Sequence, residues 1–219
     1  MKGVAMCDRE RIMEVKKGCY SKSTNKIMEK LFSIRIGSPQ FRIRETSDPN
    51  AKHYYYYTQE MLLNDLDGSV ISENRNTMRQ IGTVDNVITV KSGDIVMNLM
   101  TGTASCVSGI HDGFLLTKNF CILDPIETVD PLYLVYLINE DQTVKRSLQK
   151  SMNEGVVRFI TTKQLDELEY PQLPPLETQR IIGNLYFNQK KLSALQIQNA
   201  QLRERLIIEQ LRRYHDDRK

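Results

Sequence analysis

A long, uninterrupted stretch of helical sequence constrains the fold of this chain more than any other feature. From Leu176 to Tyr214 the sequence contains no proline and one glycine, Gly183. At 1.5 Å per residue, a helix over these positions would extend roughly 55–60 Å, far beyond the average globular helix. Three prolines between positions 171 and 175 precede it. We therefore predict a globular domain over residues 1–172, one long helix over residues 173–214 and a flexible tail over residues 215–219.

Apolar residues in this stretch recur every seven positions, as they do along the seam of a coiled coil. The two rows are Leu185, Leu192, Asn199 and Leu206, and Ile181, Asn188, Leu195 and Leu202. A helix cannot bury a stripe of this length alone, so we expect a partner helix. The predicted dimerisation residues are Ile181, Leu185, Leu192, Leu195, Asn199, Leu202 and Leu206. Asn199 is either a buried amide that fixes the register or a residue on the wet edge, and the sequence leaves both open.

Residues before the prolines predict a mixed domain of short elements. Segments 33–37, 41–44, 54–58, 84–90 and 94–100 have the alternation or composition of strands, and Asp67-Gly68 and Ser92-Gly93 have turn chemistry. Alternation would bury two of the four tyrosines at 54–57 and expose two. Short helices are expected over residues 9–15 and 25–32, over 132–139 after Pro131, and over 163–168 with Thr161 or Thr162 as N-cap. The predicted fold class is α/β (mixed α+β), followed by one long C-terminal coiled-coil helix.

The composition is that of an ordinary globular chain. Hydrophobic residues make up 40% and charged residues 26% of the 219 positions. No apolar run approaches the ~20 residues that cross a bilayer, and the N-terminus lacks the apolar core of a signal peptide. We therefore expect a cytoplasmic protein that does not enter a membrane. The four cysteines show no Cys-x-x-Cys spacing, which favours reduced thiols over a zinc site or a disulfide framework.

Charge is distributed unevenly along the chain. Residues 1–60 hold 12 Lys/Arg against 7 Asp/Glu, residues 61–170 hold 9 against 15, and residues 171–219 hold 9 against 5. A basic face can attract the phosphates of nucleic acid. A basic region alone is more often a solvated surface, so charge by itself does not identify the partner.

No catalytic constellation stands above chance. The glycines of residues 101–109 do not follow a nucleotide-binding pattern. Ser108, His111 and Asp112 are close in sequence but make a poor triad candidate, because a triad is defined by geometry. Glu14-Val15-Lys16 is half of a metal-dependent nuclease site and lacks a second carboxylate on a neighbouring strand. We therefore expect a non-catalytic protein with no metal and no cofactor.

Two stretches resemble a known family. Residues 168–182 read Leu-Glu-Tyr-Pro-Gln-Leu-Pro-Pro-Leu-Glu-Thr-Gln-Arg-Ile-Ile. They are similar to the junction between a target-recognition domain and the conserved helix of a Type I restriction-modification specificity subunit. Residues 92–96, 119–124 and 130–137 resemble the central strands and following helix of such a domain, with weaker likeness at Gly155 and residues 31–37. The resemblance covers residues 31–214, and only the junction motif is individually specific.

Members of that family usually carry two recognition domains and two conserved helices, whereas this chain has one of each. The resemblance implies a half-length specificity subunit that reads double-stranded DNA and recruits methyltransferase and restriction subunits. A homodimer would restore the usual layout and read an inverted-repeat, bipartite site. Pairing with a different half-subunit and a truncated remnant are the alternatives.

Arg, Lys, Thr and Tyr side chains are candidates to contact base edges and phosphates. Arg42 and Arg44 would project from one face of a strand, and the others lie just beyond it or in loops. The predicted DNA-binding residues are Arg42, Arg44, Lys52, Tyr55, Tyr57, Arg75, Arg79, Thr101, Thr103 and Lys118. Two other functions stay open, a stand-alone DNA-binding regulator and an interaction protein that binds no nucleic acid. A small-molecule enzyme ranks last because no convergent catalytic set is present.

Overall fold

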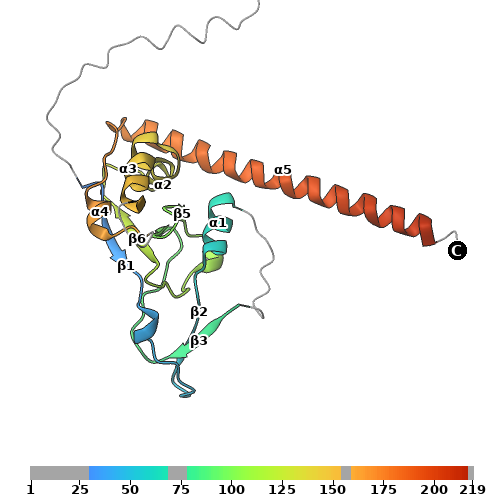
Figure 1. The fold of residues 1–219 in the computed structure, drawn as a ribbon, viewed down its shortest axis with the longest axis horizontal. Coiled ribbons are helices and arrows are strands. Elements are labelled where there is room, and N and C mark those ends of the chain that lie inside the picture. Colours follow the sequence, from blue (N-terminus) through green and yellow to red (C-terminus); the bar gives the residue numbers. More distant parts are fainter. Residues whose placement is uncertain (1–29, 69–77, 154–158, 217–219) are drawn as a thin grey trace, which may run out of the picture.

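The computed structural model describes residues 30–68, 78–153 and 159–216. A domain of sheets and short helices lies against the first part of a long helix, α5 (Leu176–Asp216), which projects well past it (Figure 1). The other elements are β1 (Phe32–Ile36), η2 (Gln40–Arg42), β2 (Lys52–Tyr55), α1 (Gln59–Asp67), β3 (Gln80–Thr83), β4 (Ile95–Asn98), β5 (Ala104–Cys106), η4 (Gly109–His111), β6 (Phe120–Pro125), α2 (Pro131–Glu140), α3 (Gln142–Asn153) and α4 (Thr162–Asp166). This mixed α+β domain with a long C-terminal helix confirms the predicted fold class.

A four-stranded antiparallel sheet forms the centre of the domain, with the strand order β1-β6-β4-β5. Strand β4 is buried throughout, so its side chains alternate between two hydrophobic clusters. Ile95 and Met97 join the cluster that contains Leu134, Val135 and Ile138 of α2 and the half-buried Tyr186 of α5. Val96 points the other way and packs with Tyr57. The sheet therefore supports α2 and α5 on one face only.

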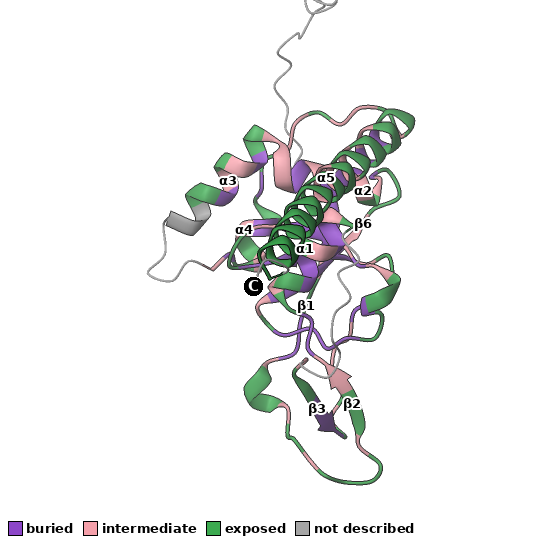
Figure 2. Cartoon of the chain, turned by 90° about the vertical axis from the view of Figure 1, so that its right-hand side faces the viewer, coloured by how far each residue is buried: buried purple, intermediate pink, exposed green. Residues whose placement is uncertain are grey.

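A two-stranded antiparallel ribbon, β2–β3, forms the end of the domain farthest from α5 (Figures 1 and 2). Isolated bridges join Tyr56 and Thr89 to Leu115. Tyr56, Ile81 and Leu115 form a small third core. These contacts tie the ribbon to the body of the domain.

One face of α5 docks on α2 and α1. The helix crosses α2 at Gly183, where a Cβ would lie 2.7 Å from the backbone nitrogen of Tyr133. One turn later the Tyr186 hydroxyl donates a hydrogen bond to Glu140 (3.1 Å). Every residue from 195 to 216 is exposed. The first half of α5 therefore packs on the domain, and the second half is surrounded by solvent. Although long, α5 is not apolar enough to cross a membrane, and neither is any other helix in the described ranges.

Several local predictions are confirmed. Helix α2 begins at Pro131, and α4 is capped by Thr161 in a capping box with Gln164. Gly93, with φ of 90°, turns the chain before β4. Helix α5 begins at Leu176, three residues after the start of the predicted segment at 173, and continues to Asp216, slightly beyond the predicted end at 214.

Other local predictions are wrong. Residues 41–44 form no strand, because the Arg42 N–H donates to the Pro39 carbonyl (3.0 Å) and closes the single turn of η2. Asp67-Gly68 is not a hairpin turn but the end of α1, where Gly68 adopts φ of 60°. Residues 84–90 form no strand either, only the isolated bridge at Thr89.

The tyrosines at 54–57 do not alternate, because the chain leaves the ribbon after Tyr55. Tyr54 and Tyr55 are half-buried, and Tyr56 and Tyr57 are both buried. Helices α1 and α3 and strand β3 were not among the predicted elements. The predicted helix over residues 9–15 and most of the one over 25–32 lie outside the described residues.

Candidate nucleic-acid interface

Five of the predicted DNA-binding side chains lie at the far end of the domain, around η2 and the β2–β3 ribbon. All five are exposed cations: Arg42, Arg44, Lys52, Arg79 and Lys118. They come from segments that are far apart in sequence. Among the described residues, none of them has an acidic side chain within 4.0 Å. Their charge is therefore available to an external anion such as phosphate.

Backbone hydrogen bonds hold these segments together. The Thr46 N–H donates to the Gly82 carbonyl (3.0 Å), which joins the loop after η2 to β3. The Arg44 N–H donates to the carboxylate of Asp85 (2.7 Å). The cations thus project from segments whose backbones are fixed to one another.

The carboxylates of Glu45 and Asp48 partly offset the positive charge at this end. Glu45 and Asp48 line a shallow polar groove beside the ribbon together with His53 and Gln80. Asp48 accepts a hydrogen bond from the Asn50 N–H (2.8 Å). The groove offers hydrogen-bonding groups rather than an apolar pocket for a small molecule.

Arg35 on β1 differs from the five cations because it is neutralised within the chain. Its Nε and Nη2 both donate to the Asp124 carboxylate at 2.7 Å, and Asp94 lies 4.0 Å from it. The hydrogen bond to Asp124 raises the pKa of Arg35. Arg35 therefore belongs to an internal ion-pair network rather than to the free cationic surface.

The two predicted tyrosine contacts occupy different environments. Tyr57 is 1% exposed, and its hydroxyl donates to Asp65 (2.7 Å). It is a core residue, so its assignment to the interface is wrong. Tyr55 is half-buried, with its ring centroid 5.4 Å from that of Phe114.

Thr101 and Thr103 do not join the cationic end. They flank Gly102 in the turn between β4 and β5. A Cβ at Gly102 would contact Leu148 of α3 and Ile160, which lies after α3. These threonines therefore lie on the α3 side of the domain. Arg75 lies outside the described residues.

Phe41 was not predicted to belong to this surface. It lies on η2, is 75% exposed and has the Arg42 guanidinium 5.6 Å from its ring centroid. The alternating pattern of residues 41–44 assigns Phe41 to the buried face of a strand, and the single helical turn brings it outward instead. The available signal is local: the Ser38-Pro39 pair that precedes it breaks a strand.

His111, one of the three residues of the weak triad candidate, belongs to a buried polar network. His111 is 2% exposed, and its Nδ1 lies 2.8 Å from Asp65 rather than near Asp112. Asp112 accepts a hydrogen bond from the Ser92 N–H (2.9 Å). The described residues contain no group of His, Cys, Asp and Glu that could hold a metal ion.

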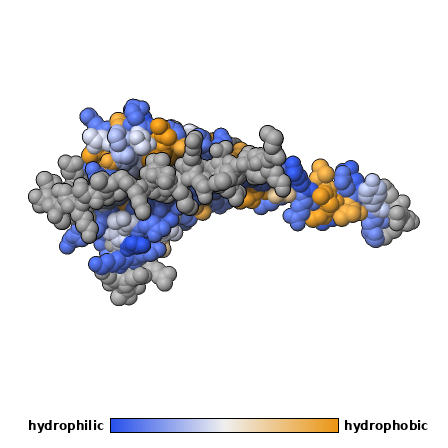
Figure 3. Space-filling view, turned by 90° about the horizontal axis from the view of Figure 1, so that it is seen from above, coloured by the Kyte–Doolittle hydropathy of each residue, from blue (hydrophilic) through white to orange (hydrophobic). Residues whose placement is uncertain are grey.

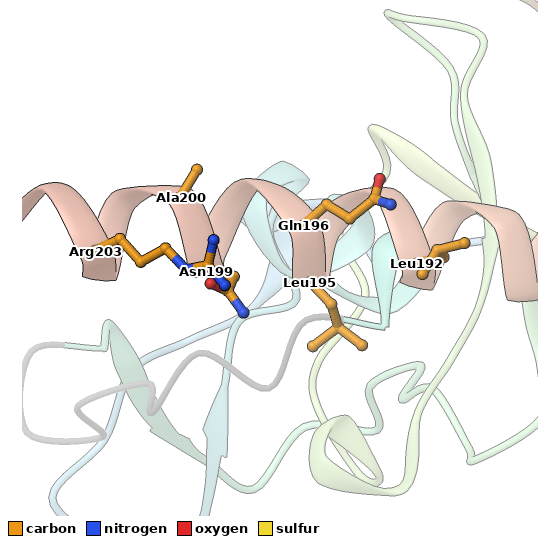
Figure 4. Close-up of a pocket in the computed structure, with 6 residues that line it drawn as sticks. All are labelled: Leu192, Leu195, Gln196, Asn199, Ala200 and Arg203. Carbon is orange, nitrogen blue, oxygen red and sulfur yellow. The ribbon is translucent and has the colours of Figure 1, made fainter.

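The predicted dimerisation seam lies on the face of α5 opposite its docked face. At 3.6 residues per turn, Gln179, Gly183 and Tyr186 fall on one side, and the seam residues fall about half a turn away. The apolar seam residues are exposed, from 49% at Leu192 to 63% at Leu185. A shallow groove on this face is lined by Leu192, Leu195, Gln196, Asn199, Ala200 and Arg203 (Figure 4).

Comparison with known proteins finds likeness in structure only. No family model and no curated protein matches the sequence. One match is a chain from a structure that describes complex assembly and conformational transition of the type I R-M system. It covers 83% of this chain and 41% of its own length, with 17% identity and a TM-score of 0.51. An HsdS subunit from Thermoanaerobacter tengcongensis matches with 16% identity and a TM-score of 0.48, over 78% of this chain and 37% of that chain. A Type-I restriction-modification system S subunit from M. genitalium matches with 20% identity and a TM-score of 0.42, over 80% of this chain and 42% of that chain.

The present chain thus spans about two fifths of the length of these three solved chains. The match with a TM-score of 0.51 extends over parts of both the domain and α5, because neither alone makes up 83% of the chain. The resemblance suggested by the junction motif is therefore confirmed at the level of the fold: this chain has the fold of a chain of the type I restriction-modification system.

Proposed function

We propose that this chain is a sequence-specific DNA-recognition subunit of a type I restriction-modification-like system and performs no catalysis itself. The observation that carries the proposal is the fold shared with a chain of such a system over 83% of the present chain. In this assignment residues 1–172 form the target-recognition domain, and residues 173–214 form a spacer and dimerisation helix. Methylation and restriction in the cytoplasm belong to partner subunits.

Double-stranded DNA is proposed to contact the end of the domain farthest from α5. The cations there lack acidic partners among the described residues, and such cations supply the salt-dependent part of DNA affinity. The proposed contacts at this end are Arg42, Arg44, Lys52, Arg79 and Lys118, with Tyr55 beside them. Phosphate contacts would set the orientation, and contacts with base edges would give selectivity.

A second copy of this chain is the partner proposed for α5. The seam is exposed while the opposite face of the helix is docked, so another helix can reach it. Leu192, Leu195, Gln196 and Asn199 in the groove are spaced i, i+3, i+4 and i+7, which is how four residues form the hole of a coiled coil. Antiparallel pairing would place the two domains at opposite ends of the spacer, and two-fold symmetry would then require an inverted-repeat, bipartite site.

DNA recognition can be tested with the purified chain and a library of duplexes with randomised centres. We expect one inverted-repeat motif to be enriched, and the logarithm of the affinity for it to fall linearly with the logarithm of the salt concentration, with a slope of about 0.9 per phosphate neutralised. The same duplex with scrambled half-sites is the control. Equal enrichment of all sequences, or no salt-dependent binding, would contradict the proposal and favour an interaction protein.

The role within a larger system needs a second experiment. The chain is co-expressed with a type I methyltransferase subunit from the same genome, and adenine methylation is mapped across genomic DNA. We expect methylation at the motif selected by the isolated chain. A selected motif that stays unmethylated, although both proteins are soluble, would identify a stand-alone DNA-binding regulator instead.

A further inference from the structure

Two cations lie within cation–π distance of the Phe41 ring at the far end of the domain. The side chain is 75% exposed. The Arg42 guanidinium lies 5.6 Å from the ring centroid, and the Lys118 ammonium lies 5.7 Å from it. A single exposed apolar side chain is ordinary on a protein surface. An exposed ring with two cations at cation–π distance is a surface that is both apolar and positive, and we name these three residues the Phe41 tip.

Backbone contacts fix the Phe41 tip in place. The Arg42 N–H donates to the Pro39 carbonyl (3.0 Å), and the Lys118 N–H donates to the buried Ser38 carbonyl (3.0 Å). Gly37 approaches the neighbouring loop so closely that a Cβ there would clash with its backbone oxygens. Because these contacts hold the backbones of both segments before any ligand arrives, ligand binding has to order only the side chains.

We propose that the Phe41 tip reads a thymine in the bound duplex, with the ring packed on the C5-methyl group and the two cations on the flanking phosphates. This inference rests on the proposed DNA-recognition function. The thymine methyl is the apolar group that base edges present in the major groove, and an aromatic side chain can contact it. Phosphates border the groove, and the cations of Arg42 and Lys118 lie beside the ring that would enter it. Neither cation has an acidic partner among the described residues that would compete with phosphate.

The test uses the full chain and the duplex that it selects. Each thymine of the site is replaced in turn by deoxyuridine, which lacks only the methyl group. Wild-type protein is expected to lose about fourfold in affinity at one thymine, the effect of burying one methyl group. Phe41→Ala is expected to weaken binding to the thymine site by at least this factor and to be insensitive to the same uracil replacement. Val84→Ala is the matched control, because Val84 is another exposed apolar residue (64%) near the ribbon.

Each result supports or overturns the inference. Insensitivity of the wild-type protein to every uracil replacement would overturn it, as would Phe41→Ala binding as tightly as wild type. A Phe41→Ala variant that still loses affinity on the uracil site would show that another side chain contacts the methyl group. In each of these cases the wild-type chain would still bind DNA selectively, so the proposed function would be unaffected. Absence of any selective binding would instead remove the proposed function and this inference together.

Discussion

The buried side chain of Gln179 on α5 accepts a hydrogen bond from the backbone N–H of Asp130 (3.0 Å), directly before α2 begins. Its amide nitrogen donates to the carbonyls of Thr128 (3.1 Å) and Pro174 (2.9 Å). One side chain therefore satisfies three backbone groups where the proline segment, the domain and the long helix meet. This contact gives the glutamine of the junction motif a physical role in setting the direction of α5.

Replacing Gln179 by methionine should destabilise the protein by about 3 kcal/mol. Methionine has a similar size but leaves the Asp130 N–H and the Thr128 and Pro174 carbonyls, which are only partly buried, without their partner. A fully buried group left so costs about 1–3 kcal/mol. Urea unfolding followed by circular dichroism measures the change. Gln172→Met is the matched control because Gln172 is exposed, and it should change stability by less than about 0.5 kcal/mol. Equal stability of the two variants would contradict the role assigned to Gln179.

Gly183→Ala should destabilise the protein, although alanine has a higher helix propensity than glycine. The added Cβ would lie 2.7 Å from the Tyr133 nitrogen and 2.8 Å from the Leu132 carbonyl carbon, so α5 must move away from α2. We expect a loss of about 2 kcal/mol in the free energy of unfolding, typical of overpacking. Gln201→Ala, in the exposed half of the same helix, should leave stability unchanged or slightly higher. A stabilised Gly183→Ala variant would show that the helices are not in close contact.

Much of the fold follows from local signals that need no tertiary context. Pro131 at the start of α2 and the capping box of Thr161 and Gln164 act over a few residues, and both were predictable. The length of α5 follows from the absence of helix breakers after Pro175. Such features depend on dihedral preference and capping, which can be read directly from the residue types.

The remaining structure depends on contacts between distant residues. Alternation predicted a buried and an exposed set among the tyrosines, but Tyr56 bridges to Leu115 and Tyr57 turns toward Asp65, so both are buried. The cationic end could not be predicted as a unit either. Lys118 meets Phe41 only because antiparallel pairing brings the loop before β6 beside η2.

Two cysteines should resist alkylation in the folded protein. Burial raises the pKa of Cys106 to about 11 and that of Cys121 to about 12. The reactive thiolate forms only as the pH approaches these values, so at pH 8 about one thousandth or less of either thiol is ionised. Iodoacetamide treatment followed by peptide mass spectrometry should show both unmodified in the native state and modified in guanidinium. Rapid native modification of Cys121 at pH 8 would contradict its burial.

The cationic end of the domain should set the salt dependence of DNA binding. Lys52→Ala combined with Arg79→Ala should reduce the slope of log affinity against log salt by about 2, one for each lost phosphate contact. The matched control is Arg146→Ala combined with Lys150→Ala, which removes one arginine and one lysine from exposed positions on α3. Fluorescence anisotropy at several salt concentrations measures both slopes. A larger effect from the α3 pair would move the interface to the other side of the domain.

The seam of α5 should decide the oligomeric state. We expect the wild-type chain to be a dimer at micromolar concentration by equilibrium sedimentation, and Leu195→Glu to be a monomer because a carboxylate would be buried in the seam. Ile197→Glu provides the matched control. Ile197 is also apolar and exposed (60%, against 49% for Leu195), but it lies on the opposite face of the helix.

The projecting half of α5 sharpens this test, because it shows further exposed apolar side chains (Figure 3). Ile207 and Leu211 are 54% and 62% exposed and lie off the seam. If these residues rather than the seam drove association, Leu211→Glu would dissociate the dimer and Leu195→Glu would not. Dissociation by Leu195→Glu alone assigns the contact to the seam, and the two-fold symmetry of the resulting dimer is what an inverted-repeat site requires. A wild-type monomer at micromolar concentration would contradict the homodimer, and the second helix would then have to come from a different chain.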